Sequence, residues 1–160
     1  MPRKMRMGWF TFTCCEDSSI LFVELLNDHY FEWREKIDFA HVKMLKTKND
    51  MKNLDVAFVE GAISNDHEEK ALREIRANCK KLVAIGACAC TGFPSAQRNA
   101  FEPAIKEEIK PFLKAHNLWE TIKRLDEIVK VDEKVPGCPM ETPIFMAVMG
   151  KCLKEFTKGV

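Results

Sequence analysis

Four of the seven cysteines in this 160-residue chain lie on turns that follow apolar, strand-like runs. Cys14 and Cys15 are adjacent on the first of these turns, and Cys88 and Cys138 stand singly on two later ones. A further apolar run ends at Glu60. In an open α/β sheet the carboxyl ends of parallel strands meet at one edge, where ligands bind. We therefore expect four thiols and one carboxylate to converge there as a metal site.

The spacing of these cysteines favours an iron–sulfur cluster over zinc. Convergent thiolates can bind either group. Structural zinc usually takes two close pairs such as Cys-x-x-Cys, whereas here one pair is adjacent and the other two cysteines are single and far apart. Adjacent cysteines form a zinc knuckle with difficulty but can hold two corners of a cubane. A zinc-stabilised interaction module is the alternative of a different class.

The remaining candidates have a structural interpretation beside the functional one. Cys79 and Cys152 lie on apolar faces of predicted helices and are expected to be small buried side chains. Cys90 fits either a ligand or a packing role. Glu16 is either a helix-start carboxylate or a functional group. Glu60 could accept backbone hydrogen bonds from the site loops or pair with an arginine of a partner, and we favour the arginine.

Composition limits the classes of function. The length suits a single domain, residues 1–160, and 25 basic against 24 acidic residues give no electrostatic case for nucleic acid. No apolar stretch is long enough to span a bilayer, and the basic start lacks the apolar region of a signal peptide. An odd number of cysteines without a secretion signal indicates reduced thiols and a cytoplasmic protein. Bound FMN is a minor option, because the turn at residues 11–18 has no glycine for a phosphate.

Strand-like and helix-like patterns alternate along the chain. Strands are predicted at 7–12, 39–45, 54–60 and 82–85, with a weaker one near 128–135; residues 86–94 are expected to form a loop. Helices are predicted from Asp17 or Ser18 to Tyr30, from the N-cap Asn65 to Cys79, from Pro103 onward, over 118–129, and from Pro143 to Phe156. In the helix that begins at Pro103, the side chains expected to point inward are Ile105, Ile109, Phe112 and Leu113. This alternation predicts an α/β sandwich with a parallel sheet.

Four segments together resemble a known family. They are Thr-Cys-Cys-Glu at 13–16, Phe-Val-Glu-Gly-Ala-Ile-Ser at 58–64, Ile-Gly-Ala-Cys-Ala at 85–89 and Val-Pro-Gly-Cys-Pro at 135–139. The pattern is similar to the small subunit of nickel–iron hydrogenases and to the related 20 kDa subunit of respiratory complex I. The resemblance covers about residues 5 to 150. It is greatest to the short small subunits of cytoplasmic hydrogenases, including the NAD-reducing type.

The resemblance implies a flavodoxin-like three-layer sandwich that holds one [4Fe-4S] cluster, proximal to a nickel–iron site on a separate large subunit. Cys88 and Cys138 match the family's ligand motifs. The usual hydrogenase motif Cys-x-x-Cys would place Phe12 at the first cysteine and Cys15 at the second. The complex I subunit has an adjacent pair instead, so Cys14 and Cys15 are implied as joint ligands. A second cluster is not expected, because the chain ends after the flavodoxin-like part.

The implied function is electron transfer during H2 oxidation or proton reduction. Electrons would pass between the large subunit, which carries the H2-activating site, and an acceptor subunit with flavin or iron–sulfur centres. The alternative is the cluster-bearing 20 kDa-type subunit of a complex I-like or membrane-bound oxidoreductase. The large subunit is expected to cover an apolar, partly exposed surface on loops 13–18, 60–65, 86–95 and 136–142 in an obligate-type contact. The apolar residues of that surface are Phe93, Pro94, Pro136, Pro139 and Met140.

Overall fold

Five parallel strands form a single sheet in the order β2-β1-β3-β4-β5 in the computed structural model, which describes residues 3–157. The strands are β1 (Met5–Thr11), β2 (Ile37–Val42), β3 (Leu54–Glu60), β4 (Cys79–Ile85) and β5 (Glu133–Val135). The helices are α1 (Asp17–Lys36), α2 (Asp66–Asn78), α3 (Gly86–Thr91), α4 (Pro103–Ala115) and α5 (Thr142–Phe156), with short 3-10 helices η1 (Ser95–Ala100) and η2 (Leu125–Glu127). This is the strand order of flavodoxin-like sheets, as predicted.

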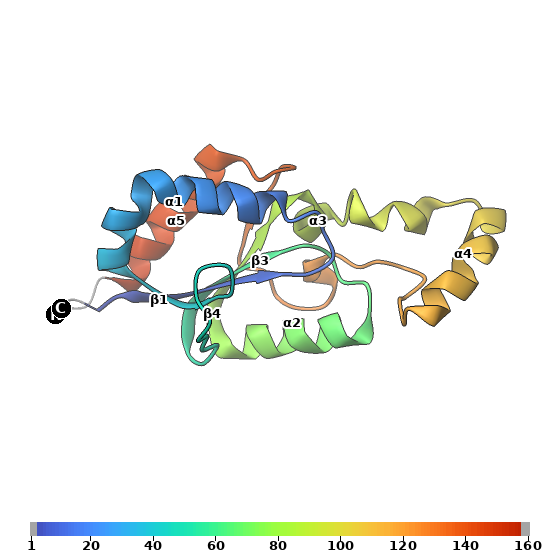
Figure 1. Ribbon diagram of the computed structural model, residues 1–160, viewed down its shortest axis with the longest axis horizontal. Coiled ribbons are helices and arrows are strands. Elements are labelled where there is room, and N and C mark those ends of the chain that lie inside the picture. Colours follow the sequence, from blue (N-terminus) through green and yellow to red (C-terminus); the bar gives the residue numbers. More distant parts are fainter. Residues whose placement is uncertain (1–2, 158–160) are drawn as a thin grey trace.

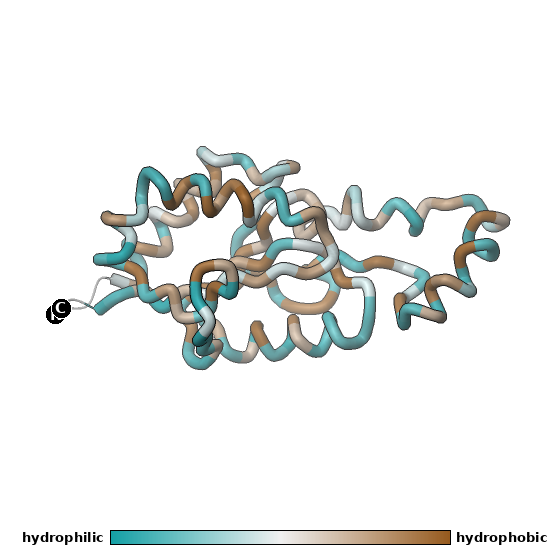
Figure 2. Tube along the Cα trace, viewed as in Figure 1, coloured by the Kyte–Doolittle hydropathy of each residue, from teal (hydrophilic) through white to brown (hydrophobic). Residues whose placement is uncertain are grey.

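Helices cover both faces of the sheet, with α1 and α5 on one side and α2 on the other (Figure 1). The α1/α5 side is filled by aromatic rings, among which Trp9 stacks on Phe22 at 4.3 Å between centroids and meets the edge of Phe145. The α2 side is mainly aliphatic, with Leu72 and Ile75 packed against β3 and β4. Figure 2 shows brown, apolar segments along the strands and on the helices that flank them, and also on α4.

The central strand β3 aligns the ends of its neighbouring strands, where the candidate site lies. All seven of its residues are buried, which explains the apolar run from Val56 to Val59. It pairs with β1 and β4, and the pairing places Thr11, Glu60, Ile85 and Val135 in one row across four strands. Each loop that carries a candidate site residue therefore leaves the sheet from the same edge.

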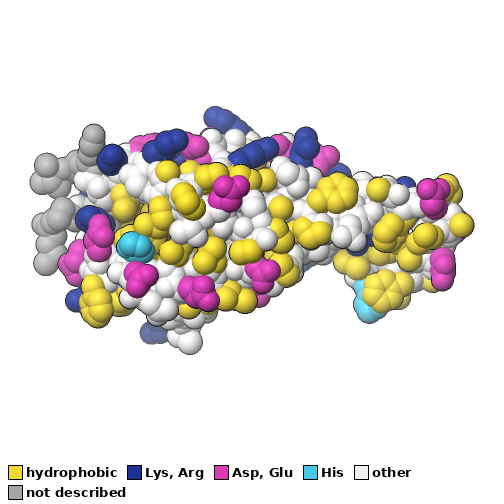
Figure 3. Space-filling view, turned by 90° about the horizontal axis from the view of Figure 1, so that it is seen from above, with side chains coloured by type: hydrophobic (Ala, Val, Ile, Leu, Met, Phe, Trp, Pro, Cys, Tyr) yellow, Lys and Arg dark blue, Asp and Glu magenta, His cyan; other side chains and the backbone are white. Residues whose placement is uncertain are grey.

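Helix α4 lies on an arm that projects from the body of the molecule (Figure 1). Leu113 is its one buried residue, whereas Phe112 is 60% exposed and Ile105 is 43% exposed. The prediction that these last two side chains point inward was wrong. Hydrophobic side chains are accordingly visible on the surface of the arm (Figure 3).

A helix over residues 118–129 was also a wrong prediction, because η2 is the only helical turn there in the part of the chain that the structure describes. Backbone groups of this segment pair outside it: Asn99 exchanges two hydrogen bonds with Ile122, both at 2.8 Å, and Lys123 pairs with Ile63. Two smaller differences concern the fourth strand. Cys79 begins β4 instead of lying on a helix face, and the segment after Ile85, predicted as a loop, starts with α3.

Candidate functional site

Hydrogen bonds tie the four strand-end loops to one another. Thr13 and Ala62 exchange backbone hydrogen bonds of 3.0 and 2.9 Å, which join the loops after β1 and β3. The N–H of Ala87 donates to the carbonyl of Gly137 at 2.7 Å, which joins the loops after β4 and β5. The hydroxyl of Ser95 links the two pairs, since it lies 3.0 Å from the carbonyl of Thr13 and 3.2 Å from the sulfur of Cys88. The loops thus form one connected frame.

Glu60 fixes the beginning of α1. It is 3% exposed, and its two carboxylate oxygens accept the N–H groups of Ser18 and Ser19, each at 3.0 Å. Asp17 or Ser18 was predicted as the cap, but the N-cap position is Glu16, in a left-handed conformation and without a side-chain cap. The carboxylate from β3 satisfies these N–H groups and places a negative charge at the positive end of the helix. Of the two interpretations of Glu60, the structure shows the backbone hydrogen bonds, and pairing with an arginine of a partner stays a prediction.

The four predicted cysteines line one small cavity, together with Glu60. Cys88 is buried, Cys14 is half-buried, and Cys15 and Cys138 are exposed. Among residues 3–157, one trio of metal-ligating side chains has its ligand atoms within 4.8 Å of one another, and it comprises Cys15, Cys138 and Asp17. Cys14 and Cys88 share the cavity without joining this trio.

The cavity is electrostatically unfavourable for free thiolates. Burial raises the pKa of Cys14 to about 12, and the charge of Glu60 and the neighbouring sulfurs of Cys88 and Cys15 raise it as well. The N–H of Glu16, 3.4 Å from the sulfur of Cys14, lowers the pKa but does not offset these effects. For Cys15 the N–H of Asp17 lowers the pKa, but burial and the carboxylate of Asp17 outweigh it, so the pKa is raised. No lysine, arginine or histidine lines the cavity among the residues described. Ionised thiols here therefore need a positive group between them.

The donor set fits a thiolate-bound metal group. All four cysteines are free thiols, and soft sulfur ligands suit both zinc and iron–sulfur clusters. A metal group would supply the positive charge that the lining side chains lack. Cys14, Cys15, Cys88 and Cys138 are the residues that would hold it.

The other cysteines lie outside this cavity. Cys90 is buried, and its sulfur lies 3.6 Å from the carbonyls of both Ala84 and Val135. Cys152 is in the core between the sheet and α5, as predicted. Burial raises the pKa of both thiols to about 11. Cys90 thus occupies a packing position, the second of its two predicted roles.

The expected apolar surface at this edge is only partly present. Phe93, Pro94 and Pro139 are exposed and Pro136 is half-buried, but Met140 is buried at 2% exposure, so its prediction was wrong. Two polar neighbours of the cysteines were missed as site residues. Asp17 had a detectable signal, because it lies two residues after Cys15; Ser95 had none, because only the folded chain brings it to Cys88.

The fold and the site together define a flavodoxin-like protein with a cysteine-lined cavity at the carboxyl edge of its sheet. A family model described as the 20 kDa subunit of NADH ubiquinone oxidoreductase matches residues 14–152. The chain belongs to this family. The matched region contains all four cavity cysteines and Glu60.

Several curated relatives are components of hydrogenases. The chain is 26% identical to a subunit of the F420-non-reducing hydrogenase of Methanocaldococcus jannaschii, over 89% of this chain and 54% of that protein. It is 23% identical to the delta subunit of the NAD-reducing hydrogenase HoxS of Cupriavidus necator, over 91% and 77% of the two chains. It is 28% identical to the delta subunit of sulfhydrogenase 2 of Pyrococcus furiosus, over 98% and 63%. The chain thus spans between about half and three quarters of the length of these relatives.

Solved structures share the fold. A chain of an NAD+-reducing [NiFe]-hydrogenase in the H2-reduced state superposes with a TM-score of 0.82 at 24% identity, covering 99% of this chain and 96% of that one. A Ni-Fe-Se hydrogenase from Desulfomicrobium baculatum gives a TM-score of 0.67 at 14% identity, with 92% and 61% covered. None of the described helices is long and apolar enough to cross a membrane.

Proposed function

We propose that this chain is the electron-transfer subunit of a [NiFe] hydrogenase, with one [4Fe-4S] cluster held by Cys14, Cys15, Cys88 and Cys138. The observation that carries the proposal is the convergence of these thiols, from three different strand ends, on a cavity without a compensating cation among its described lining residues. The hydrogenase relatives support the choice of complex.

The chain's own residues would hold and shield the cluster. When bound, a [4Fe-4S] cluster takes up and releases single electrons. Glu60 holds the start of α1 and so fixes the loop that carries Cys14 and Cys15. Ser95 donates toward the sulfur of Cys88, a kind of hydrogen bond that tunes cluster potentials.

The nickel–iron site and the terminal electron acceptor would belong to other subunits. Cys15 and Cys138 are exposed, so a large subunit docked at this edge would bring its metal site close to the cluster. An acceptor subunit with flavin or iron–sulfur centres would complete the path in H2 oxidation or proton reduction. Seven free cysteines suit a complex in the reducing cytoplasm.

A second candidate is the 20 kDa-type subunit of a complex I-like or membrane-bound oxidoreductase. The family description and the adjacency of Cys14 and Cys15 favour it. Nickel and a subunit with two Cys-x-x-Cys motifs in the purified complex would distinguish the hydrogenase from this alternative.

The test is anaerobic purification of the chain with its native partners, followed by metal and sulfide analysis. Because partner subunits would carry iron of their own, the proposal requires at least about four irons and matching sulfide per copy of this chain, with a broad brown absorbance that dithionite bleaches. Stoichiometric zinc without iron would contradict the cluster and support a zinc-stabilised module. Iron without nickel in the complex would contradict the hydrogenase assignment alone.

A further inference from the structure

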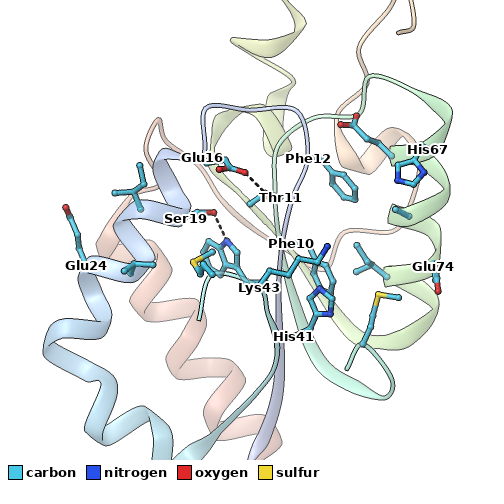
Figure 4. Close-up of a pocket in the computed structure, with 18 residues that line it drawn as sticks. Phe10, Thr11, Phe12, Glu16, Ser19, Glu24, His41, Lys43, His67 and Glu74 are labelled. Carbon is cyan, nitrogen blue, oxygen red and sulfur yellow. Dashed lines mark hydrogen bonds between the residues drawn. The ribbon is translucent and has the colours of Figure 1, made fainter. Parts of the chain in front are cut away.

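A large groove lies beside the thiol site, between α1 and α2. Its volume is about 920 Å³, close to the upper range of ligand-binding clefts. Its floor is the end of β1, at residues 9–12, and α1 and α2 contribute side chains from opposite sides (Figure 4). The exposed apolar side chains of Ile20, Val23 and Met44 line it. None of the thiols that line the smaller cavity lines this groove.

The floor of the groove contains a free strand edge. The pairing of β1 with β2 ends where Trp9 lies opposite Val42, but β1 continues to Thr11. On that side Phe10 and Thr11 have no neighbouring strand among the residues described. Unpaired strand edges are sites where an extended peptide can add to a sheet through backbone hydrogen bonds.

A residue that lines the groove, His41, has a buried nitrogen without a partner. His41 stacks on Phe10 at 4.5 Å between ring centroids, and both rings line the groove (Figure 4). The Nδ1 atom of His41 is buried without a hydrogen-bond partner, one of only two such side-chain atoms within residues 3–157. A buried polar atom without a partner costs free energy, which a turn of the His41 ring toward a peptide N–H in the groove would relieve.

The charges that line the groove select the occupant. Glu16, Glu24, Glu68 and Glu74 contribute carboxylates, whereas Lys43 contributes the single lysine ammonium of the lining residues described. Glu24 and Glu74 stand on opposite sides of the groove (Figure 4). A ligand with a phosphate would be repelled there, and lysine or arginine side chains would be attracted.

We propose that the groove receives an extended, apolar and basic segment of a partner subunit, which adds to the free edge of β1. This inference rests on the proposed function, because the segment is taken to come from the subunit that covers the thiol edge. The two surfaces are continuous, since Phe12 and Glu16 line the groove and flank Cys14 and Cys15 in the chain. The partner would thus be held both over the cluster and beside it.

The experiment is site-specific photo-crosslinking in the native complex. A benzophenone amino acid replaces Val23 or Met44 in the groove, Phe93 at the thiol edge, or Phe31, which is 75% exposed and outside both sites. Val23 and Met44 should crosslink to one short segment of the partner, rich in apolar and basic residues, and Phe93 to the same subunit. Phe31 should give no adduct with that segment.

The pattern of adducts separates the two proposals. Three outcomes would overturn the inference and leave the proposed function standing. They are adducts from Phe93 but none from Val23 and Met44, groove adducts with a second copy of this chain, and a groove segment without basic residues. A chain that purifies without a partner would overturn both. Removing the charges with Glu24→Gln and Glu74→Gln together should lower the groove crosslink about three- to tenfold, whereas Glu108→Gln on α4 should not. An unchanged yield in the double variant would also contradict the inference.

Discussion

Glu60 holds Ser19 by two hydrogen bonds, from its backbone N–H at 3.0 Å and from its hydroxyl at 2.6 Å. The same hydroxyl accepts the indole N–H of Trp9 at 2.8 Å. The last residue of β3 is thereby joined to the start of α1 and to the middle of β1. This buried network, and not a surface ion pair, determines how the first thiol-bearing loop leaves the sheet.

Replacing Glu60 with alanine should destabilise the protein by about 2–3 kcal/mol, because buried N–H groups at the start of α1 would lose a charged acceptor. Urea unfolding measures the loss. The control is Glu16→Ala, since Glu16 is exposed and its side chain accepts one hydrogen bond, from Thr11. That change should cost less than about 0.5 kcal/mol. Equal effects of the two substitutions would contradict the capping role.

Gly137 has a φ of 109°, and a Cβ there would lie 2.5 Å from the carbonyl oxygen of Pro139. Gly137→Ala should therefore destabilise the protein by about 2 kcal/mol or more and displace Cys138. Gly150→Ala is the matched control, because a Cβ at Gly150 in α5 has no neighbour within 4 Å. It should raise stability by about 0.5–1 kcal/mol through helix propensity. Thermal unfolding of both variants checks the contrast.

The buried carboxyl of Asp55 should make the free energy of unfolding fall at acid pH. Burial alone would raise the pKa of this carboxyl, but Lys80, the N–H of Arg6 and the charge of Arg3 together lower it. The folded-state pKa thus lies below the unfolded value, so the stabilisation is complete above about pH 4 and is lost as the pH falls through the folded pKa.

Urea midpoints at pH 7, 5, 4 and 3 test this expectation with Asp55→Asn. The variant should be less stable than the wild type at pH 7, and the difference should shrink as the pH falls below 4. Asp28→Asn, at an exposed position of α1, should leave the profile unchanged. A difference that is constant across the pH range would contradict the assignment.

The cysteines should separate into ligands and packing residues. Cys88→Ser or Cys138→Ser should lose or convert the cluster, which iron analysis and low-temperature spectroscopy would detect. Cys152→Ser places a hydroxyl in the apolar core and should lower stability by about 1–3 kcal/mol while iron is retained. Loss of iron in Cys152→Ser but not in Cys138→Ser would reverse the ligand assignment.

The sheet and the convergence of the cysteines were predictable because both depend on local patterns. A strand buried on both faces, such as β3, contains an uninterrupted apolar run, here Val56 to Val59, and a parallel arrangement sends the ends of its neighbours to the same edge. Cys14 and Cys88 could therefore be placed near each other before any coordinates were known.

Features that depend on distant partners were not predictable. The role of Glu60 required knowing where the N–H groups of Ser18 and Ser19 would lie, and Met140 is buried where its N–H meets the hydroxyl of Ser18 at 3.2 Å. The irregular segment near Ile122 follows from bonds to Asn99, which local helical periodicity does not reveal.

The projecting arm has a consequence for local opening of the chain. A helix of 13 residues that buries only Leu113 is marginal on its own, so most of its order depends on neighbours. Its base is fastened, because Asn99 is hydrogen-bonded to Ile122 and Arg98 donates to the carbonyl of Trp119 at 2.6 Å. Amide protons of α4 should exchange with solvent far faster than those of β3, through fraying that leaves the sheet closed.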